Sequence, residues 1–140
     1  MSDISVSVRS KLISDSNVTS LVGSRIYPSA LPQNADLPAI RYETSIQRPI
    51  NKLSGGAGFA ISTVSVDIIA ESHIAAYNVQ QAVRESLQGW TGTAGSTEFA
   101  SVSAVNIRED FIEPIDASDV GRYRVNMDFE IIHEQTIPTH

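Results

Sequence analysis

The chain has 140 residues, of which 41% are hydrophobic and 19% charged, and these are ordinary values for one globular domain. Sixteen acidic and ten basic side chains give a net charge of −6, and the basic residues are dispersed from Arg9 to Arg124. This distribution argues against sequence-independent nucleic-acid binding, which needs a concentrated positive surface. No cysteine is present, so disulfides, thiolate metal sites and cysteine nucleophiles are excluded. We expect a single domain over residues 1–140.

The N-terminal residues from Met1 to Arg9 are polar and include Asp3, so they do not resemble a secretory signal. No run approaches the roughly 18 apolar residues that a membrane span requires. We therefore expect a soluble protein that is made and used inside a cell, with no membrane partner.

The first half of the chain mixes helical and extended patterns. Apolar residues recur every three to four positions over 4–14, which predicts a first helix, and Asn17 is suited to cap a shorter helical turn that Gly23 ends. Three prolines between residues 25 and 38 predict an extended connector. Two strands are predicted next, over 39–46 and 59–70, and residues 49–58 are predicted to form a flexible loop between them.

The second half contains the clearest helix and the clearest strand. Ser72 is suited to cap a helix that runs to about Gln88. A loop with three glycines follows, and then a strand over 102–112. In the last element, which begins at Arg122, apolar and polar residues alternate strictly, as expected for a half-buried strand.

These elements predict an α+β fold with a four-stranded, mainly antiparallel sheet and helices packed on one face, in the order α-β-β-α-β-β. The apolar face of the final strand should contact the helix over 72–88, and the expected core residues are Tyr123, Val125, Met127, Phe129, Ile131, Val79, Val83 and Leu87. Val125→Asp should then unfold the subunit, whereas Asn126→Asp on the opposite, solvated face should be mild.

Residues for catalysis or cofactor binding are not apparent in the sequence. His73, His133 and His140 do not have metal-ligand spacing, and no nucleophile elbow or calcium-binding loop occurs. We therefore predict no enzymatic activity, no cofactor and no metal.

The polar face of the final strand carries both signs of charge, at Arg122, Arg124, Asp128 and Glu130. Such a face is either the solvated side of a sheet or an interface on which a basic patch meets a neighbour's acidic patch. The pattern alone leaves both interpretations open.

Several segments together resemble the phage tail-completion family, which is similar to the head–tail joining and terminator proteins of long-tailed bacteriophages. The segments are 21–28, 31–33, 37–42, 66–70, 82–87 and 122–129, and the first three combine three prolines, a glycine, an arginine and two tyrosines in register. The resemblance spans nearly the whole chain.

The resemblance implies a structural virion protein that forms a hexameric ring at the head-proximal end of the tail. Such a ring caps the tail tube, stops its polymerisation and joins it to the head connector, and DNA may pass through it. The expected partners are other copies of the chain, the tail tube protein and a head connector or stopper protein. Assembly is expected in the cytoplasm of a bacterial host.

Two alternatives remain at this stage. One is a head-side neck adaptor or stopper, and the other is a small ligand-binding or hydrolytic domain with an unrecognised site. For a ring, the loop over 49–58 is predicted to become ordered only on assembly, and its available anchors are Ile50, Lys52, Leu53 and Phe59.

Overall fold

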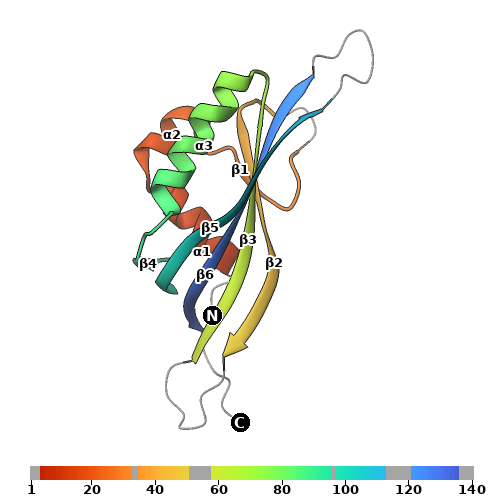
Figure 1. The fold of residues 1–140 in the computed structure, drawn as a ribbon. Helices are drawn as coiled ribbons and strands as arrows, with labels where there is room; N and C mark the ends of the chain where they lie inside the picture. Colours follow the sequence, from red (N-terminus) through yellow and green to blue (C-terminus); the bar gives the residue numbers. More distant parts are fainter. Residues whose placement is uncertain (1–3, 33–34, 51–57, 96, 113–120, 136–140) are drawn as a thin grey trace.

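The computed structural model describes residues 4–32, 35–50, 58–95, 97–112 and 121–135 (Figure 1). The described chain forms three helices, which are α1 (Ile4–Ile13), α2 (Ser16–Val22) and α3 (His73–Leu87). It also forms six strands, which are β1 (Ile26–Pro28), β2 (Ala39–Ile50), β3 (Gly58–Ala70), β4 (Gly92–Ala94), β5 (Thr97–Ile112) and β6 (Arg122–Gln135).

The six strands belong to one mixed sheet in the order β1-β2-β3-β6-β5-β4. β1 runs parallel to β2, and the other neighbours are antiparallel. The sheet curls into a half-barrel around the helices, so that α1 contacts β2 near one edge and β4 at the other (Figure 1). The predicted four-stranded, mainly antiparallel sheet with helices packed on one face is therefore wrong. The prediction missed β1 and β4 because each has only three residues and is defined by pairing with a longer neighbouring strand.

The helices begin and end at residues with local capping roles. The hydroxyl of Ser72 accepts the Ala75 N–H at 3.2 Å, which confirms it as the cap of α3. The cap of α2 is Asp15, whose carboxylate accepts the Asn17 N–H at 2.9 Å, so the prediction of Asn17 as the cap is wrong. Gly23 follows α2 with a φ of 59°, as the sequence predicted for a helix-ending glycine.

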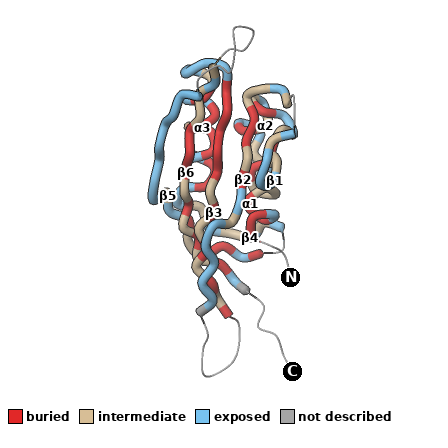
Figure 2. The backbone as a smooth tube through the Cα atoms, turned by 90° about the vertical axis from the view of Figure 1, so that its right-hand side faces the viewer, coloured by how far each residue is buried: buried red, intermediate tan, exposed pale blue. Residues whose placement is uncertain are grey.

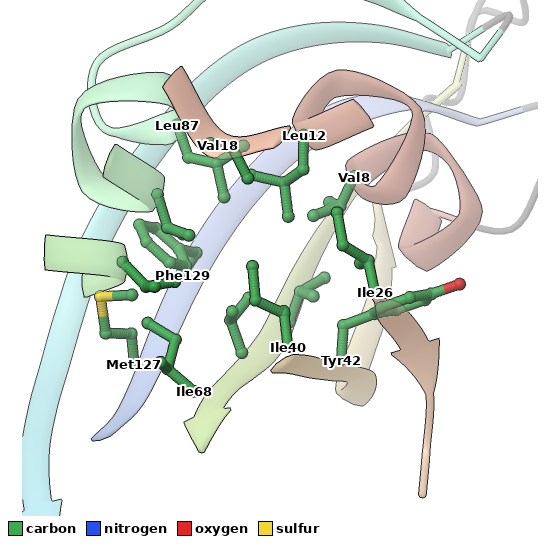
Figure 3. Packing of buried hydrophobic residues seen from close by; sticks show 14 of the residues in the cluster. Val8, Leu12, Val18, Ile26, Ile40, Tyr42, Ile68, Leu87, Met127 and Phe129 are labelled. Carbon is green, nitrogen blue, oxygen red and sulfur yellow. The ribbon is translucent and has the colours of Figure 1, made fainter. Parts of the chain in front are cut away.

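The predicted core is confirmed. Val125, Met127, Phe129 and Ile131 are buried on the side of β6 that faces the helices, and Tyr123 is partly buried against them. Val79, Val83 and Leu87 of α3 belong to the same cluster. Side chains from the other strands of the sheet and from α1 and α2 complete it, and Figure 3 shows Ile40 directed toward Val8 and Leu12 and Ile68 beside Met127.

Helix α1 connects the two edges of the curled sheet. Arg9 Nε donates to the Ile26 carbonyl of β1 at 3.1 Å. On the other side, the Ser7 hydroxyl is 2.9 Å from Thr97 Oγ1 of β5, and this pair is buried. Gly95, in the turn between β4 and β5, has a φ of 54°, and an added Cβ would lie 3.1 Å from the Ser7 Cα. The turn therefore needs glycine both for its backbone conformation and for its close approach to the helix.

One polar pair lies within the apolar core at the end of β3 and β6. His133 is 3% exposed, and its Nε2 is 2.7 Å from the hydroxyl of the buried Ser62. Its Nδ1 is 2.9 Å from the Glu134 carbonyl oxygen, which can only accept, so Nδ1 carries the proton and Nε2 accepts from Ser62. Burial lowers the pKa of His133 below 6.5, and the bond to the Glu134 backbone opposes this shift only in part.

Ser7→Ala should destabilise the fold by about 1–2 kcal/mol, because it leaves the buried Thr97 hydroxyl without its partner on α1. Ser14→Ala is the matched control, since the exposed Ser14 hydroxyl bonds only to the Lys11 carbonyl of the same helix end. Urea unfolding measures both. Equal loss in the two variants would contradict the bridging role of α1.

The stability of the protein should fall with pH below about 6.5 in a way that depends on His133. In the unfolded chain the His133 imidazole takes up a proton near this pH. In the folded protein its pKa is lowered, so it takes up the proton only at lower pH. Between the two pKa values, acid therefore favours the unfolded state. His133→Gln removes this titration. The parent should therefore lose more unfolding free energy than the variant between pH 7.5 and 5.5, and parallel losses would rule out a contribution from His133.

Candidate assembly surfaces

The sheet has an outer face, which we define as the side chains that point away from the core. Directly paired residues share a face, so Arg41, Asp67 and Asn126 lie together on it, as do Ser65 and Asp128. Arg122, Arg124 and Glu130 occupy the same face of β6, because successive side chains of a strand alternate. The outer face is thus the polar side that the sequence predicted for the final strand.

Asp67 is the centre of a charged cluster on the outer face. Its side chain is 7% exposed and forms an ion pair with Arg41 on the neighbouring strand. Asn126 Nδ2 donates to Asp67 Oδ1 at 2.5 Å, and Arg124 Nε lies 4.0 Å from the same oxygen. Two guanidinium groups and an amide thus surround one buried carboxylate, which is the arrangement that burial of a charge requires.

A second contact fixes Asp128. Ser65 Oγ donates to its Oδ1 at 2.6 Å, and Asn106 Nδ2 lies 3.5 Å from its Oδ2. Asp128 is therefore hydrogen-bonded within the subunit, whereas the Arg124 Nε lies near Asp67 without a hydrogen bond. Arg122 is exposed and Glu130 is half-buried, so these two residues extend the predicted charged face to its ends.

The expectation that Asn126→Asp is mild assumed a solvated side chain, and this assumption is wrong, because Asn126 is 8% exposed and hydrogen-bonded to Asp67. Alternation along a strand identifies the face of a residue but not its burial. The ion pair between Asp67 and Arg41 was not predicted either. The available signal was Asp67 itself, a single charge within the apolar stretch of residues 64–70.

Only two of the other predicted assembly residues, Ile50 and Phe59, fall within the described part of the chain. Lys52 and Leu53 fall outside the described residues, as does most of the predicted loop over 49–58. Ile50 is the last residue of β2. Phe59 is half-buried on β3, and its Cα partners are Ile50 on one side and Glu134 on the other. Both strands continue beyond the predicted boundaries, so the described part of this region is regular sheet.

The second half of β5 and the start of β6 form an arm, which we define as residues 105–112 and 121–126. The arm runs beside the start of α3, where the His73 ring lies 5.9 Å from the Tyr123 ring, and its tip points away from the helices (Figure 1). β5 is exposed along most of its length (Figure 2). Phe111 packs against Tyr123 with ring centroids 5.0 Å apart, while remaining 46% exposed. Val105, Ile107 and Ile112 are also exposed, so the arm presents apolar side chains to solvent on a regular strand.

An open hollow of about 300 Å³ lies where the arm meets the connector between β1 and β2. Leu31, Leu37, Ile69, Ile112 and Arg122 contribute to its lining. Among the described residues, no group of three His, Asp or Glu side chains is arranged to hold a metal ion. No helix in the described part of the chain has the length and hydrophobicity needed to cross a membrane.

Residues 6–134 match the family described as tail completion protein gp17. The chain belongs to this family. No curated protein matches the sequence. Among solved structures, the tail-completion chain is similar to one from the virion of a native gene transfer agent particle, with a TM-score of 0.69 and 16% sequence identity. The similarity covers 94% of this chain and 95% of the other, so the two share the whole fold.

The family match confirms the resemblance inferred from the sequence. It assigns the protein to the tail-completion proteins, which are structural components of phage tails. For such a protein, the relevant features are surfaces rather than pockets. The structure offers the outer face with its charged cluster and the projecting arm.

The Asp67 cluster can be tested by exchanging its carboxylate and amide. Asn126→Asp should cost on the order of 2–3 kcal/mol, because it removes a donor to Asp67 and adds a second buried carboxylate beside it. The double variant Asp67→Asn with Asn126→Asp restores one carboxylate and one amide between the arginines. A double-mutant cycle by urea unfolding should show that the pair recovers most of this loss. A double variant no more stable than Asn126→Asp alone would refute the cluster.

Proposed function

We propose that the protein is a tail terminator, whose copies form a hexameric ring at the head-proximal end of the tail tube. The ring stops polymerisation of the tube and joins it to the head connector, and DNA passes through its centre. The observation that supports this proposal most strongly is the family match over residues 6–134, nearly the whole chain.

The surfaces of the subunit are consistent with assembly. A monomer has no use for the apolar side chains of the arm, because exposed hydrophobic surface favours association. The net charge of −6 also suits a wall past which DNA moves, since the chain lacks the concentrated positive charge that retains phosphates. The ring thus needs contacts with protein rather than with nucleic acid.

Light scattering coupled to size-exclusion chromatography, followed by electron microscopy with purified tail tubes, tests the proposal. We expect a ring in solution or on the tubes, and tubes capped at one end that no longer elongate. A strict monomer at high concentration that does not associate with tubes would be incompatible with the terminator. Binding to the head connector without tube capping would identify a head-side adaptor instead.

A deletion of residues 53–57 provides a second arm of the same assay. The loop that joins β2 to β3 is proposed to order on assembly, so the deletion should leave the melting temperature of the subunit nearly unchanged while fewer tubes are capped. Capping equal to that of the parent would leave the loop without a role in assembly.

A further inference from the structure

Two strands have an edge along which no strand of the described chain lies. β1 covers only residues 40–42 of β2, and β4 covers only the start of β5, at 97–99. Beyond these, the Gly89 N–H bonds to the Val102 carbonyl of β5, and the Ser29 N–H bonds to the Tyr42 carbonyl of β2. Within the described residues, no strand lies along the remaining edges, over 43–50 of β2 and 103–112 of β5, so these edges are open to another strand.

We propose that the open edge of β5 in one copy pairs antiparallel with the open edge of β2 in the next copy. The inference rests on the proposed ring and identifies the contact that builds it. Each subunit contributes one edge to each of two neighbours. Such a head-to-tail contact is the kind that generates rings when its rotation closes.

The directions of the strands fit this pairing. β2 is antiparallel to β3, β3 to β6 and β6 to β5, so β2 and β5 of one copy run in opposite directions. A neighbour that continues the sheet in the same orientation therefore places its β2 antiparallel to this β5.

The two open edges lie at different heights along the strand direction, and a closed sheet requires such a shift between neighbours. The open part of β2 lies against residues 59–65 of β3, whereas the arm lies beside the other end of that strand (Figure 1). A neighbour must therefore shift along the strand direction to bring its β2 to this arm. Strand tilt and a fixed shift in register are what a sheet needs to close into a ring-like barrel.

The side chains of the two edges are complementary in one register. Arg48 of β2 and Asp110 of β5 both lie on the outer face, opposite Ile61 and Arg124 in their own subunits. Placing Arg48 opposite Asp110 also places the exposed Ile46 opposite the exposed Ile112, which forms an apolar pair beside the ionic one.

The backbone supports the same register. On both edge strands, residues whose side chains point into the core direct their backbone N–H and C=O groups toward the open edge. Tyr42 of β2 and Val102 of β5 show this, because their side chains are buried and their carbonyls accept hydrogen bonds at that edge. Gln47 and Phe111 share this face, so their backbone groups also point toward the neighbouring copy. The outer-face residues Arg48 and Asp110 then form a non-hydrogen-bonded pair, in which side chains are closest.

Introduced cysteines test the contact directly, because the chain contains none of its own. Arg48→Cys and Asp110→Cys are made in separate chains and mixed after assembly conditions are established. Two strands separate these positions within one copy, so a disulfide between them reports on neighbouring copies. The control mixture replaces Arg48→Cys with Gln47→Cys, whose side chain lies on the other face.

Mild oxidation should give at least tenfold more disulfide dimer in the matched mixture than in the control. A chain that carries both Arg48→Cys and Asp110→Cys should give a ladder that ends at the closed ring. Further cysteine pairs join residue 46 to residue 110 or 112. If rings form but no pair gives more disulfide dimer than the control, the edge pairing is wrong while the proposed ring still stands. If the parent neither self-associates nor caps tubes, the proposed function fails and the pairing fails with it.

Charge exchange provides a second readout that does not depend on oxidation. Arg48→Asp or Asp110→Arg alone should raise the subunit concentration needed for half-assembly about tenfold, and the two changes together should restore it. Melting curves confirm that each variant is folded. Variants that assemble like the parent in every combination would overturn the proposed register.

Discussion

Contact of helix α1 with both edges of the sheet determines the shape of the whole subunit. Arg9 bonds to the backbone of β1, while Ser7 bonds to Thr97 beside β4. Because these residues are two positions apart on one short helix, the edges of a six-stranded sheet must approach a common support, and the sheet curls. Val8 and Leu12 of the same helix fill the interior of the curl and are fully buried. Lys11 adds a further contact, 4.8 Å above the Trp90 ring in the glycine-containing loop.

The curl also explains why two strand segments remain open. A helix can support the edges only along its own length, and β2 and β5 are longer than the region that α1 covers. Register shifts occur in both ladders, between Thr44 and Ile46 of β2, and on β5 between Phe99 and Ser101 and between Ala104 and Asn106. A bulge bends a strand and increases its local twist. The shifts at 44–46 and 104–106 thus bend each strand near the start of its open segment.

Features of the sequence that depend on local chemistry were predicted well. Helix α3 is observed within one residue of its predicted ends, because Ser72 caps it and Val79, Val83 and Leu87 recur at helical spacing. The inner face of β6 was predicted for a similar reason, since an apolar residue stands at every second position from Tyr123 to Ile131. Burial of that face then followed from the need to remove it from water.

Features that depend on distant partners were not predictable in the same way. β1 has only three residues and is defined by parallel pairing with β2, and β4 occurs among glycines that indicated a loop. The burial of Asn126 depends on Asp67, which is 59 positions away in the chain. Among the predicted interface residues, Asp128 is hydrogen-bonded within the subunit, which was not predictable because its partner Ser65 comes from another strand. The open edges likewise became visible only when strand order was known.

Open edges are a hazard for a free subunit, and β2 carries a feature that limits uncontrolled pairing. Pro49 lies on β2 and cannot donate a hydrogen bond, so the ladder with a neighbour is short. A single weak contact of this kind dissociates readily, whereas in the proposed ring every subunit would hold two neighbours at once, and the second contact would form at high effective concentration. On that proposal, the weakness that keeps free subunits apart makes assembly depend on completing the ring.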